Sequence, residues 1–139
     1  MLLARPFRVV ATIATFAAVA FGLGTYTHAN FTDIHMLLGL IVALALLILA
    51  LLATLTSGMR QLGALGIAYA FLVPVFGVTQ QMILAGNLHW LVETLHLGVG
   101  FGALAFINAI SARLIRRRRM AGNGGLSSAE VVRDAQSIG

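Results

Sequence analysis

Two histidines stand near the start of long apolar segments, and a glycine follows each of them four residues later. His35 precedes Gly39 in "DIHMLLGLIVALALLILALL", and His96 precedes Gly100 in "ETLHLGVGFGALAF". Imidazole is the commonest metal ligand in proteins, and an ionisable side chain within a lipid-spanning helix marks a functional site. A glycine one helical turn away leaves space beside the imidazole. The motifs predict a pair of metal ligands, with a hydrogen bond between helices as the structural alternative.

The composition predicts that these helices lie in a membrane. The chain has 139 residues, of which 60% are hydrophobic and 9% charged, whereas a soluble domain carries about 25% charged residues. Four apolar stretches reach the roughly 20 residues that a transmembrane helix needs, namely 7–26, 34–55, 62–84 and 88–115. Short connections make neighbouring helices antiparallel. We therefore predict an all-α integral membrane protein, an up-down four-helix transmembrane bundle built from two pseudo-repeated helical hairpins.

The basic residues predict the orientation in the membrane. All nine are arginines, and they lie before the first stretch, between the second and third, and after the fourth: Arg5, Arg8, Arg60, Arg113, Arg116, Arg117, Arg118, Arg119 and Arg133. The positive-inside rule places such residues in the cytoplasm. We predict a multi-pass protein of the inner or plasma membrane with both termini cytoplasmic. Its arginines contact anionic lipid headgroups rather than nucleic acid.

The character of the sequence changes after Arg119. Residues 1–119 form the predicted membrane domain. Residues 120–139, "MAGNGGLSSAEVVRDAQSIG", are polar and rich in Gly and Ser, so we predict a flexible cytoplasmic tail that carries no chemistry. The spacing of Ser127 and Glu130 allows one short helical turn within it. The chain contains no cysteine, which excludes disulfides and thiolate metal sites.

Haem suits the predicted interior near the outer side of the bundle. Haem is a large apolar disc with a polar propionate edge, and two axial imidazoles from opposed helices can hold its iron. His35 and His96 would be these ligands, and Gly39 and Gly100 would let the macrocycle approach. This predicts one b-type haem per chain, near the outer face of the membrane.

The depths of the histidines leave other ligand sets open. His96 lies deeper in its segment than His35, by roughly 6 Å at 1.5 Å per residue, and His89 matches the depth of His35 better. His89, Glu93, His96 and Gly100 share one helical face because they are spaced i, i+4, i+7 and i+11. A non-haem metal site at His35, His89 and Glu93 therefore stays open. His28, in the first predicted outer loop, is a further candidate ligand.

The membrane part of the chain resembles one half of the haem A synthase family. "FTDIHMLLGLIVALALLI" resembles the second helix of either half, and "FGVTQQMILAGNLHWLVETLHLGVGFGALAF" resembles the third and fourth helices. The resemblance covers about residues 7–115 and rests on the helix layout and the two histidines. It implies a four-helix unit with haem between His35 and His96.

The chain departs from that family in the features that carry catalysis. The enzymes have eight helices, and four are predicted here. Thr32 stands where the catalytic half has a glutamate, Met36 stands where an arginine usually follows the histidine, and the loop cysteines are absent. We therefore predict a haem-binding protein of electron transfer or haem handling, in a respiratory or haem-assembly context. A homodimer acting as a half-length haem A synthase-like oxidoreductase, and a cofactor-free subunit of a larger complex, are the alternatives.

Overall fold

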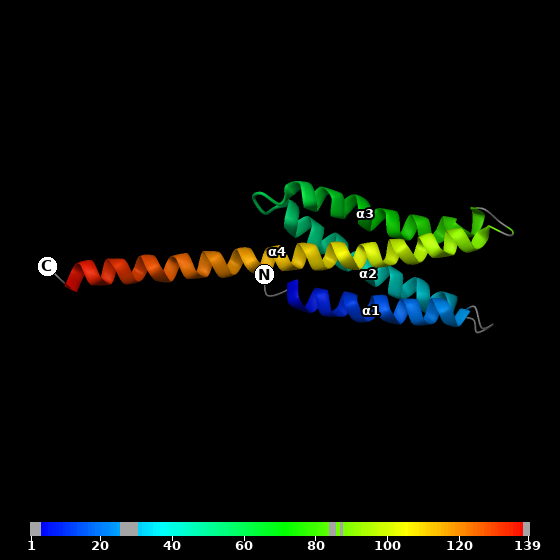
Figure 1. Ribbon diagram of the computed structural model, residues 1–139, viewed down its shortest axis with the longest axis horizontal. Helices are drawn as coiled ribbons and strands as arrows, with labels where there is room; N and C mark the ends of the chain where they lie inside the picture. Colours follow the sequence, from blue (N-terminus) through cyan, green and yellow to red (C-terminus); the bar gives the residue numbers. More distant parts are fainter. Residues whose placement is uncertain (1–3, 26–30, 84–85, 87, 138–139) are drawn as a thin grey trace.

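The computed structural model describes residues 4–25, 31–83, 86 and 88–137. All regular secondary structure in these residues is helical. In chain order the elements are α1 (Ala4–Thr25), α2 (Thr32–Thr54), α3 (Arg60–Thr79), the 3₁₀ turn η1 (Gln80–Met82) and α4 (His89–Ser137). The four α-helices run alternately in opposite directions, so the two ends of the chain lie at the same end of the bundle (Figure 1). Each α-helix contains a segment long and apolar enough to cross a membrane. The predicted four-helix architecture is thus confirmed.

Two helix boundaries differ from the predicted ones by more than three residues. Helix α3 ends at Thr79, before the predicted residue 84, because the polar residues at its end pass into the turn η1. Helix α4 continues to Ser137 and projects well beyond the other helices (Figure 1), where the sequence predicted at most one helical turn. An interior glycine costs a helix only about 1 kcal/mol relative to alanine. Without a proline the helix continues through "GNGG"; the flexibility of this segment stays a prediction.

The two histidine-bearing helices form the centre of the bundle. Helices α2 and α4 contact each other, and each of them also contacts α1 and α3, whereas the described parts of α1 and α3 do not touch. Side chains of α2 and α4 that point inward therefore face each other directly.

The close-packed core lies in the half of the bundle nearest the chain ends. Its buried residues include Ala11, Ala14, Leu46, Leu49, Ala50, Ala53, Ala103, Ile107, Ile110 and Leu114. Two glycines bring α3 close to α2, because a Cβ atom at Gly66 would lie 2.9 Å from the Cβ atom of Ala50 and one at Gly63 would meet the backbone of Thr54. Small residues at a helix interface permit this close approach.

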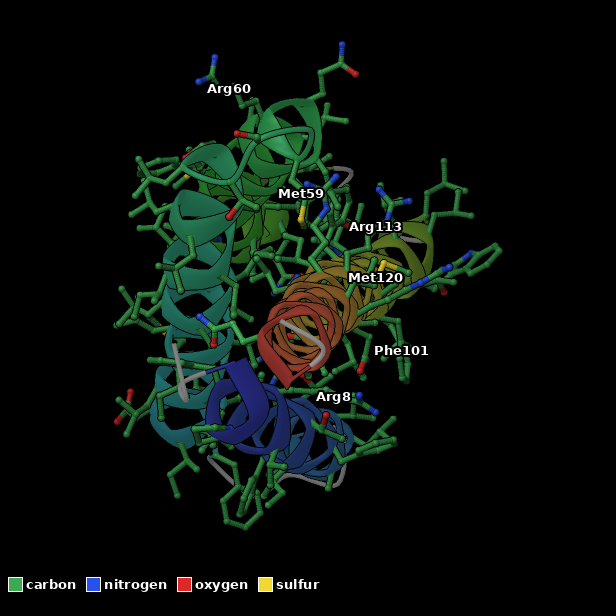
Figure 2. All side chains as sticks on the ribbon, turned by 90° about the vertical axis from the view of Figure 1, so that its left-hand side faces the viewer. Arg8, Met59, Arg60, Phe101, Arg113 and Met120 are labelled. Atoms are coloured by element: carbon green, nitrogen blue, oxygen red, sulfur yellow. The ribbon has the colours of Figure 1, made fainter. Side chains whose placement is uncertain are left out.

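Arginines gather at this closed end. Arg117 donates hydrogen bonds to the carbonyl oxygens of Ser57 and Gly58, which ties α4 to the turn between α2 and α3. Gly58 occupies that turn with a φ of 71°, a conformation that glycine adopts without steric cost. Figure 2 shows Arg8, Arg60 and Arg113 pointing away from the bundle. The described arginine side chains thus lie at the end opposite to His35 and His96.

Candidate functional site

The outer half of the bundle, away from the arginines, encloses a cavity of about 1140 Å³. Residues 32–41 of α2 and 71–79 of α3 include no buried side chain, in contrast to the packed inner half. All four helices line the cavity. The candidate residues that line it are His35, Gly39, His89, Glu93, His96 and Gly100. The helical face predicted from their spacing on α4 therefore faces one common space.

His35 is held by the backbone of α1. Its Nδ1 lies 2.8 Å from the carbonyl oxygen of Ala18. A carbonyl oxygen only accepts hydrogen bonds, so Nδ1 carries the proton and donates, and in the neutral ring Nε2 keeps a free lone pair. Gly22 makes room for the ring, because a Cβ atom there would lie 3.0 Å from His35 Cε1.

His96 is held by α3 through its ring face. The imidazole stacks on Phe76, with ring centroids 5.9 Å apart and an angle of 15° between the planes. A Cβ atom at Gly77 would lie 3.6 Å from His96 Cε1, which is ordinary contact. The Nδ1 atom of His96 is buried and has no hydrogen-bond partner among the described residues. A buried nitrogen left in this state costs about 1–3 kcal/mol.

The structure brings His35 and His96 together. Their ring centroids lie 5.7 Å apart, with an angle of 48° between the planes. The expected difference in depth is compensated because α4 begins farther toward the outer end than α2 does (Figure 1). Helix position therefore selects His96, rather than His89, as the ring next to His35.

The two glycines predicted beside the histidines both face open space. Gly39 and Gly100 line the cavity, and a Cβ atom at either position would have no atom within 4 Å outside its own helix. The wall on both sides of the histidine pair is therefore bare backbone, which lets a flat ligand approach α2 and α4 closely.

His89 and Glu93 form a second polar pair on α4. His89 Nε2 lies 3.8 Å from Glu93 Oε1, and about one third of each side chain is exposed. Within the described part of the chain, no three His, Asp or Glu side chains group closely enough to hold a metal ion. His35, His89 and Glu93 therefore do not form such a group in this structure, and the alternative metal site stays a prediction. His28, the other candidate ligand, lies outside the described residues.

Sequence reasoning missed the residues that fix the two rings. The carbonyl of Ala18 accepts from His35, and Gly22 and Gly77 provide the space for the imidazoles. The spacing of Ala18 and Gly22, two small residues four apart on α1, is a signal for close approach of a neighbouring helix. That signal shows a close approach without showing which side chain makes it.

Comparisons with known proteins found no relative of this chain. No family model matches this chain, and neither a curated protein nor a solved structure matches it. The inference about the site therefore rests on its own geometry.

A larger side chain at Gly22 should displace His35. In the Gly22→Leu variant, the leucine occupies the space of the imidazole, so the hydrogen bond to Ala18 should be lost. Nitrogen-15 NMR of histidine-labelled protein in detergent measures this, with the His35 signal assigned from His35→Ala. The wild-type ring should carry a proton on Nδ1 that is hydrogen-bonded, and Gly22→Leu should lose this signature. Gly98→Leu is the matched control, since nothing lies within 4 Å of a Cβ atom there; an unchanged His35 signal in Gly22→Leu would contradict the placement.

Proposed function

We propose that this chain is an integral membrane protein that binds one b-type haem between His35 and His96 and serves electron transfer or haem handling. One observation carries the proposal: two imidazoles from opposed helices line one large cavity, with their ring centroids 5.7 Å apart. An imidazole nitrogen binds a first-row metal at about 2.0–2.1 Å, so two rings on opposite sides of one ion have centroids about 6 Å apart. The observed separation supports ligation of one iron.

The surface of the bundle supports the membrane location. Large apolar side chains are exposed around it, including Val9, Ile13, Phe16, Leu44, Leu51, Leu65, Phe71, Leu72, Val75, Leu95 and Phe101. Soluble monomers rarely expose contiguous apolar surface of this extent. In a bilayer these side chains contact lipid, and the helices satisfy their own backbone hydrogen bonds.

The chain's own residues would hold and orient the cofactor. The Ala18 carbonyl orients the ring of His35 and increases its basicity as a ligand, as partners of metal-bound histidines commonly do. The bare walls at Gly39 and Gly100 would receive the faces of the macrocycle. Haem with both axial positions filled supplies one-electron exchange rather than oxygen chemistry.

The two histidines should be separately required for the haem spectrum. In the purified, haem-supplied protein, His35→Ala and His96→Ala should each abolish the low-spin visible spectrum, because each removes one axial ligand. His89→Ala and His28→Ala are the controls and should keep the spectrum. Extracted pigment should be unmodified haem b by chromatography. A wild-type protein without a Soret band would favour a cofactor-free subunit. Loss of the spectrum in His89→Ala but not in His96→Ala would show that His89, rather than His96, is the second ligand.

The glycines beside the histidines should control haem content. In Gly39→Leu and Gly100→Leu, the added side chain enters the cavity. Overpacking costs about 1–3 kcal/mol, so affinity for haem should fall about tenfold or more. The haem-to-protein ratio measures the loss. Gly98→Leu adds the same side chain to the same helix outside the cavity and should retain haem; equal haem content in Gly98→Leu and Gly100→Leu would show that Gly100 does not line the cofactor.

Orientation can be tested because the chain has no cysteine. We place the arginine-rich end in the cytoplasm by the positive-inside rule, which puts the cavity toward the outer face. Ser57 and Asp33 are exposed at opposite ends of α2 or just beyond it. In intact cells, a membrane-impermeant maleimide should label Asp33→Cys and leave Ser57→Cys unlabelled until lysis. The reverse pattern would invert the protein in the membrane.

A further inference from the structure

We infer a second ligand site at the outer mouth of the cavity, formed by His89, Trp90 and Glu93, that binds the head group of a membrane-soluble hydroquinone. All three residues line the cavity, and they belong to the first two turns of α4. The site uses neither His35 nor His96, and it rests on the proposed function only for the membrane location of the protein.

The mouth offers a hydrogen-bond donor and an acceptor side by side. His89 Nε2 and Glu93 Oε1 are 3.8 Å apart, which is too long for a hydrogen bond. A ligand that carries a hydroxyl group could donate to the Glu93 carboxylate and accept from Nε2 of the His89 ring, because these two groups lie side by side.

The charges around the mouth favour a neutral ligand. No lysine or arginine occurs between residues 9 and 59 or between 61 and 112, so the outer end offers no fixed cation to a phosphate or fatty-acid headgroup. Glu93 would repel such a group further. A lipophilic cation would have to share the Glu93 carboxylate with the His89 ring, which lies beside it. A neutral head group with hydroxyls avoids both penalties.

The remaining lining suits an aromatic head and an apolar tail. Trp90 lines the cavity with 57% of its surface exposed, so its ring is free to pack against an aromatic ligand. Leu37, Leu40 and Leu97 line the same cavity and are 58%, 48% and 40% exposed. These leucines give the cavity an apolar wall on α2 and α4, which the apolar tail of a hydroquinone would contact.

The cavity has room for a head group beside the histidine pair. Its volume of about 1140 Å³ exceeds the roughly 300–1,000 Å³ of common ligand pockets. His89 precedes His96 by seven residues on α4, which places the mouth about 10 Å farther out along the helix axis. The mouth therefore lies beyond the histidine pair along the same cavity.

Trp90 provides a direct readout because it is the single tryptophan of the chain. The full chain carrying His35→Ala is placed in phosphatidylcholine nanodiscs and titrated with decyl-benzohydroquinone under reducing conditions. This variant is chosen because the proposed function predicts that it lacks haem, which would absorb the Trp90 emission. We expect saturable quenching of Trp90. In this background, Glu93→Gln and His89→Phe should each weaken binding about tenfold or more, since each removes a hydrogen bond to a charged or buried group.

Asp33→Asn is the matched control, because Asp33 is an exposed acid in the first turn of α2 and does not line the cavity; its affinity should equal that of the parent. Linear, unsaturable quenching in the parent protein would overturn the site even if the Glu93 and His89 variants fail to fold. Saturable quenching by tetraphenylphosphonium but not by the hydroquinone would make the mouth a cation site and overturn the proposal. The haem spectrum is measured separately, so loss of haem binding and loss of hydroquinone binding are distinguishable results.

Discussion

The arrangement of the site depends on one constraint, which is that polar imidazoles must be accommodated inside an apolar bundle. His35 meets this constraint through a helix carbonyl, since its Nδ1 donates to Ala18 on the neighbouring α1. Gly22 favours the contact, because a Cβ atom there would lie only 3.0 Å from His35 Cε1. A single hydrogen bond thus fixes the ring, its tautomer and the local approach of α1 to α2. The other ring nitrogen is then available to a ligand.

The two halves of the bundle differ in packing: the inner half is close-packed, and the outer half surrounds the cavity. In the inner half, alanines and glycines bring the backbones together, and Arg117 closes the turn between α2 and α3. Tyr69 marks the transition, because its hydroxyl donates to the Val99 carbonyl at 3.1 Å and a side chain at Gly102 would overlap it. Beyond this point the helices surround a cavity. A rigid inner half can hold the outer halves of α2 and α4 at a separation that their own few contacts would not maintain.

The sequence predicts the helices better than their relative positions. Apolar length alone gives four helices, and Gly39 and Gly100, singled out by the histidine–glycine spacing, both line the cavity. The number of helices does not predict how far α4 is shifted along the bundle axis relative to α2. This shift follows from the connection between α3 and α4, which contains the turn η1 and Gly86 with a φ of 105°. That shift decides whether His89 or His96 meets His35. The partner of His35 is a backbone carbonyl, which leaves no mark in residue type, and the continuation of α4 to Ser137 runs through glycines that the composition associates with flexible chain.

The two hairpins carry the same histidine–glycine spacing, but the two histidine rings make different contacts. His35 donates a hydrogen bond to α1. The ring of His96 instead stacks on the ring of Phe76 from α3, and its Nδ1 has no hydrogen-bond partner among the described residues. Ring stacking holds the plane of an imidazole but not its proton, so the tautomer of His96 is free to follow the ligand that it meets. The same helix also carries His89 and Glu93 at the mouth. One helix pair therefore presents a fixed imidazole on α2 and an adaptable polar face on α4, and the adaptable face is the one that reaches the opening of the cavity.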